Sequence, residues 1–196
     1  MDVFYEESAV ARDSVKGARK YRILSIISGF FLALAIFCVL MFLWLPLNDA
    51  PTLILWGIIC AGHFGIWYLL RRWRQRFNVS YDYCFVSGEL RISRVININK
   101  RKLVARFDSE DIIQLGDVEN SSFERFSHDP TVKMVLCTSN DEPMNGKFFM
   151  YVLANYNGKK LFVLECREDL LINIMKFTKR TALESDYVMQ EKKAKR

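Results

Sequence analysis

Two long stretches without a formal charge constrain this chain more than any other feature. The first covers 26 residues from Ile23 to Asn48, and the second covers 21 residues from Ala50 to Leu70. A helix needs about 20 apolar residues to cross the hydrocarbon core of a bilayer. We therefore expect a two-helix transmembrane hairpin over residues 23–70. Such runs exclude a wholly soluble protein, a disordered chain and a small disulfide scaffold.

The charges around these runs predict their orientation. The link Pro46–Pro51 has no Lys or Arg, whereas basic residues flank the other end of each run. Because Lys and Arg are retained on the cytoplasmic side, we expect a two-span protein of the cell membrane with both termini in the cytoplasm. The first run is too long for a signal peptide and no Ala-x-Ala site follows it, which favours an uncleaved anchor. The basic flanks are Arg19, Lys20 and Arg22 before the first run, and Arg71, Arg72, Arg74 and Arg76 after the second.

Small residues recur at a spacing of four in both apolar runs, which places them on one face of each helix. Lipid supplies no hydrophobic drive between helices, so close packing of small residues has to hold them together. We therefore expect the two stripes to face one another; the alternative is that small residues are simply common in membrane helices. The helix-packing residues are Ser25, Gly29 and Ala33 in the first run and Gly57, Ala61 and Gly65 in the second.

His63 is the only ionisable residue in the second run. It lies about 200° around the helix from Ala61 and Gly65, and so points away from the small-residue stripe. We expect a contact with another subunit or an unpaired His near the interface, with a proton relay as the less favoured alternative.

The remaining chain divides into three further segments. Residues 1–22 mix charges with loosely helical apolar spacing, which fits either an amphipathic surface helix or a cytoplasmic tail. Residues 71–187 are expected to form a cytoplasmic domain. Residues 188–196 form a basic tail that is expected to be disordered.

From Val79 onward, the apolar residues follow strand periodicity, until a helical spacing appears between Leu170 and Phe177. Asn157-Gly158 between two apolar runs is a strong hairpin signal. Phe123 and Phe126 are expected to anchor a polar loop or short helix. The expected strands are 79–86, 89–98, 102–108, 111–118, 131–138, 148–155 and 159–166.

Two motifs carry a resemblance to a known family. Tyr81-x-Tyr83-x-Phe85-x-Ser87-Gly88-Glu89-Leu90-Arg91-Ile92 is similar to the opening hairpin of bacterial pleckstrin-homology-like membrane proteins, and Asp108-Ser109-Glu110-Asp111-Ile112-Ile113 resembles the segment before their fourth strand. The likeness covers about residues 71–182 and the hairpin. More narrowly, the chain resembles a two-span family of Gram-positive anaerobes.

The resemblance implies a fold, and it indicates where basic residues would lie if the domain bound phosphoinositides. The fold is a transmembrane α-hairpin plus a mainly-β (α+β) domain: a PH-like two-sheet barrel of about seven antiparallel strands capped by a C-terminal helix. Lipid-binding pleckstrin-homology domains carry basic residues around the loop between strands one and two. Here we expect that loop at Ser87-Gly88, where no cation occurs before Arg91. This argues against specific phosphoinositide binding at that loop.

The charge distribution separates possible partners. The net charge is +6, yet residues 77–187 hold 15 basic and 16 acidic residues. A nucleic-acid binder would carry its basic excess on the domain, so nucleic acid is not an expected partner. The basic clusters could instead bind anionic headgroups. The alternatives are that the arginines after the second run only set the topology and that Lys100–Lys102 form a solvent-exposed turn. The candidate headgroup residues are Arg71, Arg72, Arg74, Arg76, Lys100, Arg101 and Lys102.

No motif points to catalysis. The five cysteines lack metal-ligand spacing, and there are only two histidines. We expect no catalytic residue, metal or cofactor. The sequence favours a membrane-anchored, non-enzymatic binding or scaffold module that meets lipids through the hairpin and a protein partner or a second copy through the domain. The alternative is a sensor of anionic lipid headgroups.

Overall fold

The structure is a computed structural model that describes residues 4–44 and 50–178. It divides into two compact units. One is the helical unit, residues 13–78. The other combines the residues up to Arg12 with those from Val79 onward. The two units are treated separately below.

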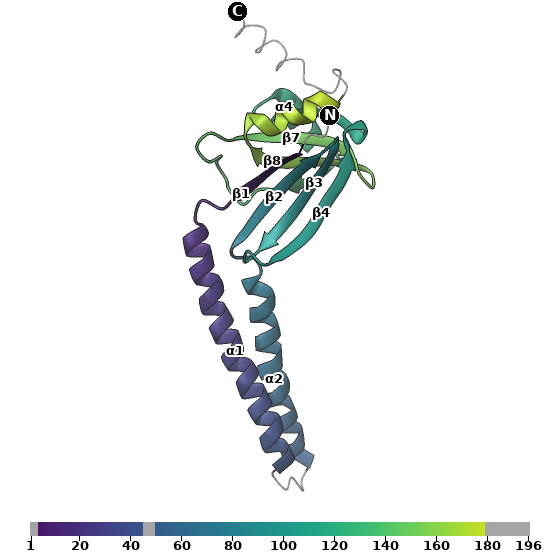
Figure 1. Cartoon of the computed structure of the whole chain (residues 1–196). Helices are drawn as coiled ribbons and strands as arrows, with labels where there is room; N and C mark the ends of the chain where they lie inside the picture. The colour runs from purple at the N-terminus through teal and green to yellow at the C-terminus, as the bar shows by residue number, and fades with distance from the viewer. Residues whose placement is uncertain (1–3, 45–49, 179–196) are drawn as a thin grey trace, which may run out of the picture. The chain divides into compact units, whose positions relative to one another are not determined.

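The helical unit is a pair of neighbouring antiparallel helices, α1 (Ser14–Trp44) and α2 (Ala50–Arg74) (Figure 1). Both are long and apolar enough to cross a membrane. Pro51 lies in the first turn of α2, where its missing N–H breaks no intrahelical bond. Most of the predicted link, residues 45–49, lies outside the described residues.

The helices meet along a seam whose residues recur every three or four positions, so that they share one face of each helix. Ser28 and Ala35 of α1 are the most buried side chains of the pair, at 2% and 0% exposure. The less exposed residues of α2 recur every three or four positions along the helix. Those α2 residues are Thr52, Trp56, Cys60, His63, Trp67, Leu70 and Arg74.

The first sheet of the domain has the strand order β1-β2-β3-β4. Its strands are β1 (Phe4–Val10), β2 (Val79–Val86), β3 (Glu89–Ile96) and β4 (Lys100–Asp108). All neighbours are antiparallel.

Strand β1 corrects the expectation for residues 1–22. Residues 4–10 are neither an amphipathic helix nor a tail, because they pair with β2 from Phe4↔Val86 to Val10↔Ser80. The hairpin is therefore inserted between two adjacent strands of one sheet. The domain consequently begins before the membrane helices rather than at residue 71.

The second sheet has the order β5-β7-β8-β6. It comprises β5 (Ile112–Asp117), β6 (Lys133–Leu136), β7 (Phe148–Asn155) and β8 (Lys159–Cys166). Edge strand β6 runs parallel to β8. The described chain thus forms two four-stranded sheets without barrel closure, and the expected barrel of seven antiparallel strands is not confirmed.

The core lies between the sheets and beneath α4 (Glu168–Phe177). Helix α4 inserts Leu170, Leu171 and Ile174, all fully or almost fully buried. Its acidic first turn complements the helix dipole. A smaller apolar cluster forms around Tyr151, against which α3 (Ser121–Ser127) packs Phe123 and Phe126. This confirms the two predicted anchors. The turn η1 (Ser109–Asp111) precedes β5.

Two tight hairpins were predicted from sequence and are confirmed. Asn157 and Gly158 have φ values of 50° and 92°, and Ser87 and Gly88 have 47° and 98°. Positive φ at both central positions is the type I′ geometry that matches strand twist. The β3–β4 reversal also uses positive φ, at Asn97 and at the β-branched Ile98.

Candidate functional site

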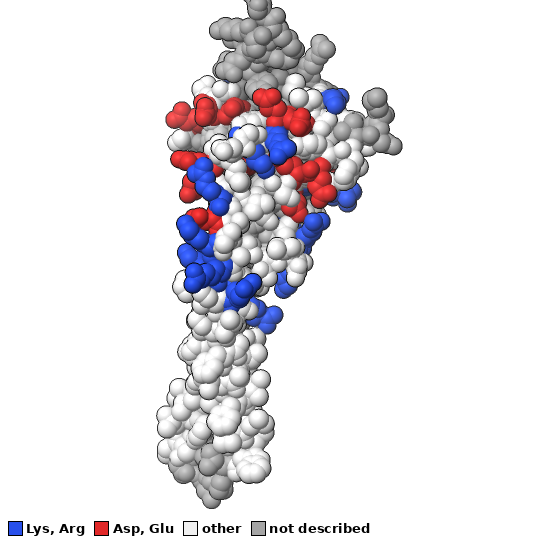
Figure 2. All heavy atoms as spheres, turned by 60° about the vertical axis from the view of Figure 1, so that its left-hand side comes forward, with Lys and Arg blue, Asp and Glu red and all other residues white. Residues whose placement is uncertain are grey.

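The basic end of the helical unit is the first candidate site. Lys16, Arg19, Lys20 and Arg22 belong to the start of α1, and four arginines belong to the end of α2. Because the helices are antiparallel, both sets lie at one end of the unit. Figure 2 shows blue side chains at that end and an uncoloured surface along the rest of the hairpin.

The four arginines of α2 do not have the same environment. Arg74 turns toward α1, where its Nη1 donates to Ser25 Oγ at 2.7 Å and its guanidinium lies 5.5 Å from the centre of the Tyr21 ring. Arg71 stacks over Trp67 at 5.3 Å. Arg74 therefore ties the two helices together, while its neighbours remain on the surface.

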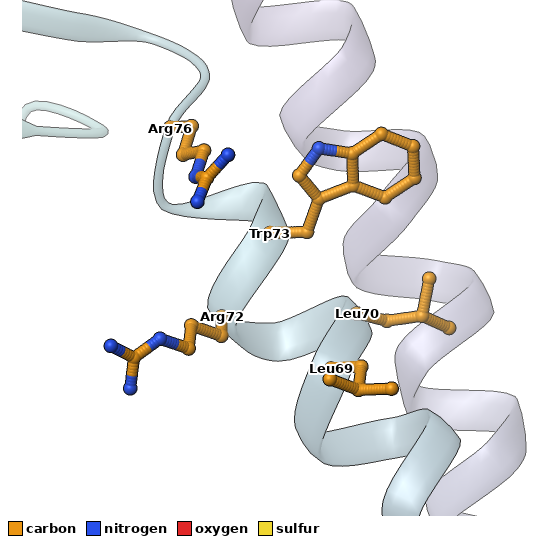
Figure 3. Close-up of a pocket in the computed structure, with 5 residues that line it drawn as sticks. All are labelled: Leu69, Leu70, Arg72, Trp73 and Arg76. Atoms are coloured by element: carbon orange, nitrogen blue, oxygen red, sulfur yellow. The ribbon is translucent and has the colours of Figure 1, made fainter.

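Arg72 and Arg76 line a groove of about 270 Å³ on α2 and the turn after it, together with Leu69, Leu70 and Trp73. Figure 3 shows the apolar side chains on one side of the arginines in this view. Arg72 lies near Tyr68 Oη at 3.5 Å, and neither arginine forms an ion pair with a described residue. Apolar walls with two available cations suit an amphipathic anion.

Lys100, Arg101 and Lys102 form a separate candidate set in the domain, at the start of β4. All three are exposed. Arg101 is 3.4 Å from the carboxylate of Asp82. Neither lysine forms an ion pair with another described residue.

The small-residue stripes are not the helix interface. An added Cβ at Gly29, Gly57 or Gly65 would meet no atom within 4 Å. Ala33 and Ala61 are likewise exposed. The prediction that these stripes face each other is therefore wrong, although Ser25 does contact α2 through Arg74. The seam on α2 lies about 140° around the helix from the stripe, at 100° per residue.

The position of the α2 seam also corrects the expectation for His63. Its ring lies 6.2 Å from the ring of Phe31 on α1, and its Nδ1 is 2.8 Å from the Ile59 carbonyl oxygen. His63 points away from the stripe as predicted, and for that reason it faces α1.

A buried polar network, which sequence reasoning missed, holds loop 138–147 on the domain. The carboxylate of Glu165 has no exposed surface. It accepts hydrogen bonds from Thr138 Oγ1 at 2.7 Å, Asn140 Nδ2 at 2.7 Å and the Met144 N–H at 3.0 Å. Tyr83, which is also buried, donates to the Cys137 carbonyl oxygen at 2.6 Å.

The same loop holds β1. Asn140 donates to the Val10 carbonyl oxygen at 3.0 Å and accepts from the Arg12 N–H at 2.7 Å. Lys147 pairs with the buried Glu7 at 3.0 Å and donates to the Ser8 carbonyl oxygen at 2.7 Å. Loop 138–147 therefore fastens the strand that leads into the hairpin. No local sequence signal predicts this pairing, because Glu7 and Lys147 lie far apart in the chain.

The thiols of the domain are poor nucleophiles. Burial raises the pKa of Cys137 to about 12 and raises the pKa of Cys166 further. A thiolate, the reactive form, is therefore disfavoured at both positions near neutral pH. Within residues 4–44 and 50–178, no cluster of three or more His, Cys, Asp or Glu side chains could hold a metal ion.

Strand β1 changes the strand numbers on either side of the Ser87-Gly88 turn. With β1 in place, the Ser87-Gly88 turn joins the second and third strands, and the whole hairpin occupies the connection between the first and second. The prediction of no specific phosphoinositide binding at Ser87-Gly88 stays a prediction. The connection between strands one and two is in fact rich in Lys and Arg at its ends.

One of three comparisons with known proteins gives a match. No curated protein and no solved structure matches the chain. A family model described as bacterial PH-like domain (DUF6106) matches residues 1–184, a range that includes β1, both helices and the domain. The match does not bear on the narrower resemblance to a group from Gram-positive anaerobes. Since the model covers nearly the whole chain, this protein belongs to the family of bacterial PH-like domains.

Proposed function

We propose that this protein is a membrane-anchored, non-enzymatic binding or scaffold module, which presents its PH-like domain at the cytoplasmic face of the cell membrane. The pairing of β1 with β2 carries this proposal. Because these adjacent strands flank the hairpin in the chain, the domain is joined to the membrane helices at two points. Such a double connection suits a module that meets its partner at the membrane.

Binding is favoured over catalysis for chemical reasons. PH-like domains are generally non-enzymatic. The buried thiols with raised pKa are unsuited to nucleophilic attack, and the buried carboxylate of Glu165 is occupied by three hydrogen-bond donors. These groups contribute to the stability of the domain.

A protein partner or a second copy of this chain is the occupant we propose for the domain. Edge strand β6 exposes Met134 at 47% and Leu136 at 59%. Edge strands carry unpaired backbone groups that can pair with another chain. The domain as a whole is nearly neutral, so shape and apolar contact would dominate over long-range charge.

Site-specific photocrosslinking in native membranes tests this proposal. A photoreactive side chain is placed at Leu136 and, as a matched control, at the half-exposed Ile172 of α4. We expect a discrete adduct at position 136 that is lost when Met134 is replaced in M134D. The proposal is contradicted if both positions give no adduct and the chain stays monomeric in mild detergent.

Anionic lipid binding is a second candidate function, favoured by the groove at Arg72 and Arg76. Each cation near an anionic leaflet gains about 1 kcal/mol. The negative end of the α2 dipole opposes an anion by about 0.3–1 kcal/mol, so the two arginines outweigh it. Lys100, Arg101 and Lys102 would add to this in the domain.

Lipid retention by the full chain tests the second candidate. We expect mild detergent to leave phosphatidylglycerol bound in preference to phosphatidylcholine, with less retained at high salt. The double variant R72Q/R76Q should retain less than R71Q/R22Q, which removes the same charge outside the groove. Equal retention of the two lipids by the unmodified protein would exclude this function.

A further inference from the structure

The reversal between β3 and β4 carries an apolar side chain at its tip. Residues Asn97, Ile98 and Asn99 connect Ile96 to Lys100. Ile98 is 82% exposed, one of the most exposed large apolar side chains of the described chain. Its backbone has a φ of 66°, in the left-handed region.

This conformation is unfavourable for isoleucine. A β-branched residue at positive φ is a genuine outlier, whereas Asn and Gly tolerate it. Neighbouring Asn97, with a φ of 50°, is such a tolerant residue. Ile98 thus combines backbone strain with an apolar side chain in water. Because its side chain is mostly exposed, burial within the domain does little to offset that strain.

The tip lies at a particular end of the sheet. Ile96 pairs with Val79, the first residue after the helical unit, and with Lys100 across the turn. Ser80 in turn pairs with Val10, shortly before the chain enters α1. Both chain connections to the membrane helices therefore join the sheet at the end that carries Ile98.

Cations follow the apolar tip directly. Lys100 and Lys102 are exposed and form no ion pair with a described residue, while Arg101 lies beside Asp82. An apolar side chain followed by two available ammonium groups is complementary to an anionic bilayer surface, whose phosphates lie above its apolar core.

We propose that residues 97–102 form a membrane-contacting tip. Ile98 enters the interface of the anionic leaflet, and Lys100 and Lys102 meet its phosphates. The proposal rests on the proposed anchoring of the hairpin in the membrane. It assigns the domain a third point of membrane contact, besides its two covalent connections.

A diazirine side chain at position 98 of the full chain, in nanodiscs of phosphatidylcholine with phosphatidylglycerol, tests the tip directly. The same probe at Ile172 is the matched control. We expect at least about fivefold more phospholipid adduct at position 98 than at position 172. This excess should fall about threefold in K100Q/K102Q or when phosphatidylglycerol is left out. Equal lipid labelling at the two positions, or protein adducts alone at position 98, would overturn the proposal.

A second variant separates membrane contact from folding. I98N places a residue that tolerates positive φ at the tip, so the domain should unfold at a higher temperature in detergent. A lower unfolding temperature would show that Ile98 packs within the fold, and would also overturn the proposal. Extraction with alkaline carbonate tests the anchoring independently. If the protein stays in the membrane while position 98 fails to label lipid, only the tip is wrong; if it washes off, the proposed anchoring itself fails.

Discussion

Replacing Glu165 with alanine should release loop 138–147 and, with it, strand β1. The substitution removes the acceptor of three hydrogen bonds, which Thr138, Asn140 and Met144 donate. Hydrogen bonds to a charged group contribute about 1.5–3 kcal/mol each, a gross loss of about 5–9 kcal/mol. Removing a buried carboxylate also removes its desolvation cost of several kcal/mol. We therefore expect a net loss of about 2–4 kcal/mol.

Amide hydrogen exchange of the full chain in detergent micelles measures this loss locally. A change of 2–4 kcal/mol corresponds to about 30- to 1,000-fold lower protection, which should appear in loop 138–147 and in β1. E142A in the same loop is the control, because Glu142 is exposed and, among residues 4–44 and 50–178, forms an ion pair only with the exposed Arg12. Surface ion pairs contribute about 0–1 kcal/mol. If E165A changed protection by less than about threefold, as expected for E142A, the network would not be what holds β1.

Three further outcomes are expected. A35L should destabilise the helix pair by about 1–3 kcal/mol in a detergent unfolding titration, because Ala35 lies in the seam, whereas G29L should change it by less than about 0.5 kcal/mol. Burial raises the pKa of the Tyr83 phenol above its usual value of 10.0, so its contribution to stability is present below pH 10 and lost above it. Urea midpoints of the domain should fall as pH rises through about 10, and Y83F should flatten that fall. Half-buried Cys84 should react with iodoacetamide at least about tenfold faster than Cys137, as followed by mass spectrometry.

Local patterns were enough for much of the domain. The bounds of β2, β7 and β8 agree with the sequence expectation, because each strand shows β-branched and aromatic residues next to a tight turn. The Asn157-Gly158 turn fixes the register of β7 and β8. Short-range information therefore determines these strands, and they are the ones that the sequence predicted best.

Long-range pairing explains what was missed. Strand β1 has Glu7 at an inward position, which breaks the apolar alternation. Its partner Lys147 lies far away in the chain, so no local pattern indicates that the charge is buried. The parallel direction of the short strand β6 likewise depends on a neighbour, and no local pattern encodes it.

The hairpin shows which part of helix packing a sequence can determine. Phe31 on α1 lies opposite His63 on α2, which defines the level at which the two helices meet. The small residues predict the wrong rotation of the helices, because they lie on a different face from the seam. The seam instead combines small side chains on α1, such as Ser28 and Ala35, with larger ones on α2. Close approach is achieved by complementary sizes across the pair rather than by glycine on both helices.

Simple dimensions explain how a membrane hairpin can be inserted into a sheet. Packed helices lie about 8–10 Å apart, and adjacent strands about 5 Å apart. Residues 11–13 join β1 to α1 and residues 75–78 join α2 to β2. Each linker can span about 10–14 Å, at about 3.3–3.6 Å per residue, which exceeds the mismatch between the two spacings. Closing the 68 residues between Val10 and Val79 costs loop entropy, and the contact between α1 and α2 shortens the loop that has to be closed. On this reasoning the membrane hairpin acts as the closed loop that brings β1 to β2, and anchoring and folding of the domain depend on one another.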